Sequence, residues 1–426
     1  MKFLLLHQNF PGQWRHLAPA LAARGHEVVA LGLTPQVPDG WLGVRVLRYQ
    51  PARGSTPGIH PWVIDVETKM IRAEAVLGAA LQLRQGGFMP DAIVAHPAWG
   101  ESLFMAEVWP DAPLGIYCEL FHQLHGQDMG FDPEFDTQEP PEVRAARLRV
   151  KNTVQWLHFD RARAGLSPTR YQADTYPPPF RGCIQVVHEG VDTEVMKPDA
   201  AATLHLRGTT GAGDSEVWEL AHGAELLTFV NRNFEPLRGC HVFMRALPDV
   251  LASRPQAYVV MVGQDGVSYG AAEPTGRGWR RRFWEEVAPR MPPKDAARVL
   301  FVPSLRRDDF TRLLQVSAVH VFLSYPFVPS WSLLEAMSCG AAVVASDTGA
   351  VREFITHAQT GYLVDFFDRD RLAKAISLLL ASPATRQRLG AAARARMQAQ
   401  FDLKTQCLPR MLDWVQRLCQ PDLSKT

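Results

Sequence analysis

The feature that most constrains the fold is a regular alternation of short apolar segments with helical patterns along the 426 residues. Segments such as 2–6, 27–31, 226–230 and 319–323 have the length and composition of buried strands. Repeated strand–helix units favour parallel sheets with helices on both faces. A chain of this length is expected to form two such domains, with ligands in a cleft at the carboxyl ends of the strands.

Composition excludes several classes of protein. The chain is 46% apolar and 21% charged with a net charge of +1, which is typical of a globular protein and gives no field that favours nucleic acid. No apolar run reaches about 18 residues, so we expect no transmembrane helix. The apolar start, Met1–His7, is too short for a signal peptide and is interpreted as a strand. The six cysteines lack zinc-site spacing and are expected to be reduced thiols.

These features predict a cytoplasmic protein. Two arginine-rich segments, 277–282 and a helix expected over 143–163, also allow a peripheral contact with anionic lipid at the inner face of the membrane. Solvated helix faces are the favoured interpretation of both segments. No specific protein partner is predicted.

The segment 319–340 predicts a strand, a loop with two prolines, and a helix that begins near Ser330. The first N–H groups of a helix are unpaired and suit a phosphate or diphosphate, and Glu335 can accept hydrogen bonds from a neighbouring sugar diol. The N–H groups in question belong to Ser332, Leu333 and Leu334. The alternative interpretation is an ordinary strand–loop–helix unit with a capping serine and a solvated glutamate.

A second loop carries two arginines six positions apart, Arg232 and Arg238, directly after the apolar segment 226–230. Arginine is permanently charged, and its forked donors fit phosphate oxygens. Surface arginines are common, but a pair followed by Gly239 at a strand end favours a phosphate site.

Together these segments resemble the retaining glycosyltransferases of family 4, which have the GT-B fold of two Rossmann-like domains facing across a cleft. Arg232 and Arg238–Gly239 match the family's Gly-Arg-x5-Lys-Gly motif, with arginine in place of lysine, and Glu335 matches the second Glu of Glu-x7-Glu. The resemblance implies that the base lies near two further strand ends, at Gly263 and at Val302, Pro303 and Ser304.

Two departures from the family pattern lie near the expected sugar. The first Glu of Glu-x7-Glu corresponds to Phe327, and the resemblance assigns Phe327, Val328, Pro329 and Ser330 to the donor sugar. An apolar residue there predicts a preference for a donor such as a deoxysugar. The family's usual His, after a strand of the first half, corresponds to Glu119, with His122 three residues later.

The first half is expected to hold the acceptor. His7 follows the first strand, and Gly12 could let the backbone approach a phosphate closely, although Pro11–Gly12 is also ordinary turn chemistry. His7 and His122 are candidate proton carriers or sugar ligands. Glu119 is the candidate base or the residue that positions the acceptor hydroxyl. Each of these three side chains also has a purely structural interpretation.

The resemblance implies transfer of a sugar, with retention, from a nucleotide-diphosphate sugar to a glycan, glycolipid or small-molecule acceptor. Glu119, Arg232 and Arg238 are the candidate catalytic residues, and neither a cofactor nor a metal is expected. Asp368 and Asp370 form an Asp-x-Asp that is interpreted as a helix cap. The setting implied by the family is synthesis of cell-surface polysaccharide, lipopolysaccharide or glycolipid. The alternatives are a non-catalytic nucleotide-sugar-binding subunit and a GT-B nucleotide-sugar epimerase.

The predicted domain boundaries follow from the same alternation. Residues 1–192 form the acceptor domain, 193–223 a glycine-rich linker or surface loop, and 224–402 the nucleotide-sugar domain. A final helical segment, 403–426, is expected to cross back to the first domain.

Overall fold

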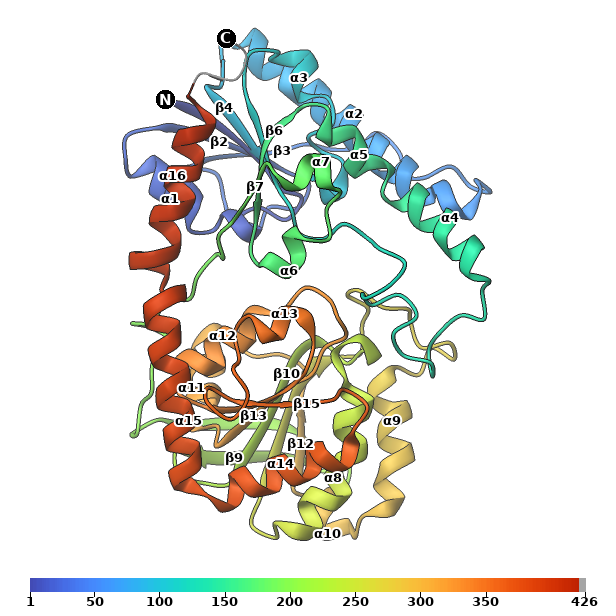
Figure 1. The fold of residues 1–426 in the computed structure, drawn as a ribbon, viewed down its shortest axis with the longest axis vertical. Coiled ribbons are helices and arrows are strands. Elements are labelled where there is room, and N and C mark those ends of the chain that lie inside the picture. The colour runs from blue at the N-terminus through green and yellow to red at the C-terminus, as the bar shows by residue number, and fades with distance from the viewer. Residues whose placement is uncertain (421–426) are drawn as a thin grey trace. The chain divides into compact units, whose positions relative to one another are not determined.

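The computed structural model describes residues 1–420 and divides into two compact units (Figure 1). Of the described residues, the first unit comprises 1–125, 137–190 and 403–420, and the second comprises 126–136 and 191–402. Each contains one sheet whose strands are mostly parallel, so the predicted α/β class with two Rossmann-like domains is confirmed. The last part of the expected final segment, residues 421–426, lies outside the described residues.

The first unit is a seven-stranded, fully parallel sheet in the order β3-β2-β1-β4-β5-β6-β7. Alternate residues of β1 face opposite sides, because Leu4 and Leu6 belong to one apolar cluster and Phe3 and Leu5 to another. The strands are β1 (Lys2–Leu6), β2 (Glu27–Gly32), β3 (Arg45–Arg48), β4 (Ala92–Ala95), β5 (Leu114–Tyr117), β6 (Ala162–Ser167) and β7 (Ile184–Val186).

Helices cover both faces of this sheet. They are α1 (Leu17–Ala22), α2 (Ile64–Gln85), α3 (Met105–Val108), α4 (Pro141–Lys151), α5 (Thr153–Phe159), α6 (Arg170–Ala173), α7 (Pro178–Arg181) and α16 (Leu408–Leu418). The last of these returns to the first unit, where Trp414 and Leu418 pack against β5 at Gly115. A Cβ at Gly115 would fall 2.6 Å from the Trp414 ring, so this close approach requires glycine.

The expected helix over 143–163 is helical as far as Phe159, apart from a break at Asn152, and only its last residues are wrong. The helical pattern breaks between α4 and α5, and residues from Ala162 onward form strand β6. This strand has the sequence Ala-Arg-Ala-Gly-Leu-Ser, which lacks the β-branched and aromatic residues that mark strands. Its pairing with β5 and β7 stabilises it instead.

The second unit is an eight-stranded mixed sheet in the order β15-β14-β13-β10-β11-β12-β8-β9. Its parallel strands are β10 (Leu226–Asn233), β11 (Tyr258–Gln264), β12 (Val299–Val302), β13 (Val319–Phe322), β14 (Ala342–Ser346) and β15 (Tyr362–Val364). Its helices are α8 (Cys240–Ser253), α9 (Trp279–Val287), α10 (Pro293–Ala296), α11 (Arg307–Val316), α12 (Trp331–Ser338), α13 (Gly349–Arg352), α14 (Arg369–Ala381) and α15 (Pro383–Arg396).

The predicted linker at 193–223 is wrong, because most of it is an antiparallel hairpin at the edge of this sheet. Strands β8 (Thr203–Thr210) and β9 (Ser215–Ala221) pair with each other, and β8 also pairs with β12. Leu204 and Leu206 of β8 and Leu220 of β9 alternate with exposed residues and fill the core. This period-2 pattern is present in the sequence, but the glycines of the turn are equally typical of a linker.

Residues 126–136, called the strap here, belong to the second unit although their neighbours on both sides belong to the first. The predicted final helix of the chain is preceded by two π-helical segments, Met397–Phe401 and Leu403–Cys407. Within the described part of the chain, no helix is both long and apolar enough to span a bilayer.

Candidate functional site

The carboxyl edge of the second sheet gathers the loops expected to bind the nucleotide. Strand β10 pairs in parallel with β11 on one side and with β13 on the other, and β12 follows β11. The loops after these strands therefore begin at the same edge. They contain the arginines, Gly263, residues 302–304 and the segment that leads into α12.

Arg238 is buried and fixed at this edge. It ends a short 3-10 turn before α8, with 5% of its surface exposed. Its Nη1 donates to the hydroxyl of Ser324 and to the carbonyl of Val328, both at 2.9 Å. The guanidinium also lies against the rings of Tyr269 and Phe327, at 5.3 and 5.7 Å. Arg238 thus joins the loops after three neighbouring strands.

Arg232 differs from Arg238 in its exposure and in its contacts. It lies near the end of β10 and is exposed, and its guanidinium makes no hydrogen bond or ion pair with the described residues. Gly239, next to Arg238, has a φ of +68°, and a Cβ there would fall 2.4 Å from Leu323. The glycine is therefore needed to bring the turn against β13.

Helix α12 begins as predicted, with Ser330 as its N-cap. The Ser332 N–H is 3.4 Å from the Ser330 hydroxyl, and the Leu333 N–H donates to the Ser330 carbonyl at 3.2 Å. The side chains of Leu333 and Leu334 are fully buried, so only backbone groups of these two residues can serve a ligand. A phosphate at this terminus would compete with the serine cap.

Glu335 lies in the second turn of α12, where 9% of it is exposed. Its Oε1 forms an ion pair of 2.6 Å with Nη1 of Arg307, at the start of α11. Arg307 was not predicted as a site residue. The signal in the sequence was its position five residues after Val302, at the end of the neighbouring strand.

The expected base-site residues separate into core and surface. Gly263 lies in β11 with its α-carbon against Phe234, so an added Cβ would lie 3.1 Å from that ring. Val302 ends β12 with its side chain in the core, so only its backbone could contact a ligand. Pro303 and Ser304 follow it and are exposed.

The donor-sugar segment is also divided. Phe327 is buried, whereas Pro329 and Ser330 are partly exposed. Val328 contributes its carbonyl to Arg238. Phe327 lies 5.2 Å from the ring of Tyr269, a residue that sequence reasoning missed.

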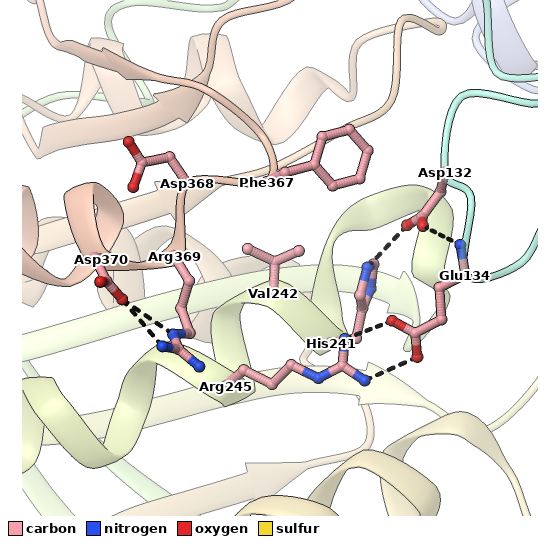
Figure 2. A pocket seen from close by; sticks show the side chains of 9 residues that line it. All are labelled: Asp132, Glu134, His241, Val242, Arg245, Phe367, Asp368, Arg369 and Asp370. Atoms are coloured by element: carbon pink, nitrogen blue, oxygen red, sulfur yellow. Dashed lines mark hydrogen bonds and ion pairs between the residues drawn. The ribbon is translucent and has the colours of Figure 1, made fainter.

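A pocket of about 410 Å³ lies elsewhere in the second unit, beside the strap (Figure 2). None of the predicted site residues lines it. Its lining consists of Asp132, Glu134, His241, Val242, Arg245, Phe367, Asp368, Arg369 and Asp370. Asp368 caps α14, as predicted, by accepting a hydrogen bond from the N–H of Arg371. Among residues 1–420, no cluster of three or more His, Cys, Asp or Glu could hold a metal.

The strap is attached to this pocket by a buried network. Oδ2 of Asp132 accepts a hydrogen bond from Nε2 of His241 at 3.0 Å (Figure 2). It accepts a second from the hydroxyl of Tyr325 at 2.7 Å. Burial acts to raise the pKa of Asp132, but these two bonds outweigh it and hold the pKa below its usual value. Arg245 holds Glu134 by two bonds of 2.6 and 2.8 Å.

The carboxyl edge of the first sheet holds a different set of groups. His7 follows β1, His96 follows β4, and Glu119 lies two residues beyond β5, and these three strands are neighbours. The rings of His7 and His96 are 5.3 Å apart, and Nε2 of His96 lies 3.6 Å from Oε2 of Glu119. Gln13 bridges the others, with Oε1 at 2.7 Å from Nε2 of His7 and Nε2 at 3.4 Å from Oε1 of Glu119.

Both histidines of this group are neutral. Burial lowers the pKa of His7 to about 4 and holds the pKa of His96 well below its usual value. Nδ1 of His7 accepts the N–H of Asn9, which leaves its proton on Nε2. Sequence reasoning missed His96, although it follows an apolar segment directly, as His7 does.

Gly12 and His122 have structural roles in the first unit. Gly12 has a φ of +44°, and a Cβ there would fall 2.1 Å from Nε2 of His7, so the glycine makes room for that ring. The backbone of His122 exchanges two hydrogen bonds with the side chain of Asn152. Nδ1 of its ring is buried without a hydrogen-bond partner among the described residues, and burial lowers its pKa to about 3. The structure therefore does not join His122 to the group around Glu119.

Comparison with known proteins identifies the family. A model of the glycosyl transferase family 4 group matches residues 24–196, and a model of glycosyl transferases group 1 matches residues 214–396. Between them the two models cover most of both units. The chain belongs to these glycosyltransferases, and its match to the family 4 model precedes its match to the group 1 model.

The relatives are distant. The D-inositol 3-phosphate glycosyltransferase of Kribbella flavida is 26% identical over 280 residues, which are 64% of this chain and 60% of that protein. The chain thus spans less than two thirds of this curated relative.

Solved structures give the fold. The sucrose-phosphate synthase from Thermosynechococcus elongatus has a TM-score of 0.71 at 19% identity, and the match covers 98% of this chain and 99% of the synthase chain. Anabaena HepE in complex with UDP and glucose has a TM-score of 0.66 at 16% identity, covering 98% and 100%. The predicted GT-B fold is confirmed by these neighbours.

Proposed function

We propose that this protein is a retaining, metal-independent glycosyltransferase that moves a sugar from a nucleotide-diphosphate sugar to an acceptor hydroxyl. The observation that carries the proposal is Arg238, a buried guanidinium fixed between the loops after β10, β11 and β13. A rigid cation at a carboxyl edge, beside the start of α12, suits a diphosphate. The complex of HepE with UDP and glucose supports a nucleotide sugar as the donor.

In the proposed reaction, the bond between the sugar C1 and the diphosphate oxygen breaks, and the acceptor oxygen bonds to C1 on the same face. Arg238 and the exposed Arg232 stabilise the charge that grows on the leaving diphosphate. Glu335, oriented by Arg307, accepts hydrogen bonds from the ribose diol. A leaving-group oxygen takes the proton of the acceptor hydroxyl, so no side chain need act as nucleophile.

The group around Glu119 is proposed to hold the acceptor. Two neutral histidines and one carboxylate can hydrogen-bond a hydroxyl without attracting a second phosphate. Glu119 would accept a hydrogen bond from the acceptor hydroxyl and so orient the attacking oxygen. By analogy with the family, the acceptor is a glycan or glycolipid of the cell surface, or a small molecule.

A thermal-shift panel of nucleoside diphosphates and their sugars tests the donor site. We expect one base to stabilise the wild type, and Arg238→Ala to abolish that shift. Arg290→Ala is the matched control, because Arg290 is an exposed arginine of the same unit in the 3-10 turn after α9, remote from the carboxyl edge. Absence of any shift with the wild type would contradict a nucleotide-sugar site.

A second candidate is a nucleotide-sugar-binding subunit without turnover. The observation that favours it is Phe327, an apolar residue where family members carry the first Glu of their motif. Nucleotide binding without hydrolysis or transfer, across a panel of acceptors and donors, would support this candidate. Turnover with any acceptor would exclude it.

A further inference from the structure

The loop between β11 and α9, residues 265–278, is held in place by two buried side chains at the end of β10. Oε1 of Glu235, which is 1% exposed, accepts hydrogen bonds from three consecutive N–H groups, those of Ser268, Tyr269 and Gly270, at 2.8, 3.1 and 3.0 Å. Asn233 accepts from the N–H of Gly266 and donates to the hydroxyl of Ser268. A carboxylate in such a nest of N–H groups fixes the backbone of the loop.

This arrangement places Tyr269 at the carboxyl edge. Its ring lies 5.2 Å from that of Phe327 and 5.3 Å from the guanidinium of Arg238. Tyr269 is 50% exposed, whereas Phe327 and Arg238 are 8% and 5% exposed. The fixed loop therefore presents a half-exposed aromatic ring beside Arg238, the residue proposed to bind the diphosphate.

Taking the proposed transfer from a nucleotide sugar as its basis, we propose that Tyr269 and Phe327 form an aromatic wall for the donor sugar. The C–H face of the pyranose ring packs against this wall while Arg238 holds the diphosphate. Pyranose rings carry an apolar face of C–H groups, and aromatic rings bury such surface with a defined geometry. A 6-deoxyhexose has a methyl group where a hexose has a hydroxymethyl group, which enlarges its apolar surface, and it is the preferred class of donor.

The aromatic wall could in principle contact either end of the donor, the sugar or the base. Arg238 touches both rings, so a diphosphate on Arg238 has the wall next to one end. Glu335, which is proposed to hold the ribose at the other end, is paired with Arg307 from the loop after β12. The wall comes instead from the loops after β11 and β13, and we assign the sugar to it.

The test compares binding of a nucleoside diphosphate with that of the corresponding nucleotide sugar by titration calorimetry. We expect Tyr269→Ala to lower the affinity for the nucleotide sugar by about fivefold to tenfold, as the loss of one aromatic contact predicts. The affinity for the diphosphate should change by no more than about twofold. Tyr269→Phe should behave as the wild type, since the ring and not the hydroxyl makes the contact. With a 6-deoxyhexose donor the loss should be larger than with the matching hexose.

The matched control is Tyr258→Ala. Tyr258 is the first residue of β11, at the opposite end of this strand from the loop that carries Tyr269. It is 43% exposed, and its ring lies 5.3 Å from that of Trp218. It should change neither affinity. Equal weakening of both ligands by Tyr269→Ala would assign the wall to the nucleoside and overturn the inference, and so would no weakening of either. Failure of the wild type to bind any nucleotide would instead contradict the proposed function itself.

Discussion

The carboxyl edges of the two sheets have the same topological position and opposite chemistry. In the first unit, His7, His96 and Glu119 follow neighbouring strands, and burial keeps both rings neutral. In the second, Arg238 and the ion pair of Glu335 with Arg307 provide permanent charge beside aromatic rings. Similar sheets thus carry different chemistry at the same edge, because a few side chains after the strands determine it.

The difference follows from what each edge is proposed to bind. A diphosphate needs fixed positive charge, whereas a hydroxyl needs a donor and an acceptor at hydrogen-bond distance. A second set of arginines at the first edge would compete for the diphosphate. Substitutions in each unit should therefore have separable effects.

The largest expected effect is at the strap of the second unit. Asp132→Ala removes the common acceptor of His241 and Tyr325, which leaves buried polar groups unpaired, and should lower the free energy of unfolding by about 3 kcal/mol. Urea unfolding at pH 7 measures this. Because the pKa of Asp132 is depressed in the folded state, its contribution is present above its unfolded pKa and is lost as the pH falls through the folded value. Wild type and variant should therefore converge in acid, and a constant difference down to about pH 2 would contradict the account.

The next effect concerns the neutral histidines of the first unit. The unfolded chain protonates His7 near pH 6.5, whereas the folded chain resists protonation down to about pH 4. Stability due to this residue is therefore full above pH 6.5 and falls as the pH drops toward 4. Between about pH 6.5 and 4.5, the free energy of unfolding should therefore fall by about 2 to 3 kcal/mol less in His7→Gln than in the wild type. The same slope of unfolding free energy against pH in both proteins would show that His7 is not the titrating group.

The smallest effect is at the ion pair of the second edge. Arg307 is about half exposed, so Arg307→Ala should change the free energy of unfolding by less than about 0.5 kcal/mol. Nucleotide affinity should fall by about threefold, since Glu335 loses the partner that orients it. Tighter binding would mean that Arg307 competes with the ribose for Glu335.

Sequence patterns predicted what local physics determines. The alternation of strands and helices, the Ser330 cap of α12 and the helix cap at Asp368 all depend on residues close together in the chain. The hairpin over 203–221 was missed because its turn glycines resemble those of a linker. Strand β6 was missed because its stability comes from pairing with β5 and β7.

The site shows the same limit. The sequence identified Arg238 and Glu335 as candidate ligands, but not the fixed loop that brings Tyr269 to Arg238, because three N–H groups meet a carboxylate some 33 to 35 positions away. His96 was missed for a similar reason, since its nearness to His7 and Glu119 depends on the order of β1, β4 and β5. His122 was included for its closeness in sequence to Glu119, but its backbone is bonded to Asn152 and its Nδ1 is buried without a partner among the described residues.

The most direct test of the central comparison measures nucleotide-diphosphate affinity and sugar transfer together for Arg238→Ala and Glu119→Gln. We expect Arg238→Ala to weaken binding of the diphosphate by at least about tenfold, the loss of a hydrogen bond to a charged group. We expect Glu119→Gln to leave that affinity unchanged and to lower kcat by about a hundredfold, the cost of a misplaced attacking oxygen. Equal loss of diphosphate affinity in both variants, or unchanged affinity in Arg238→Ala, would contradict the division of tasks between the two edges.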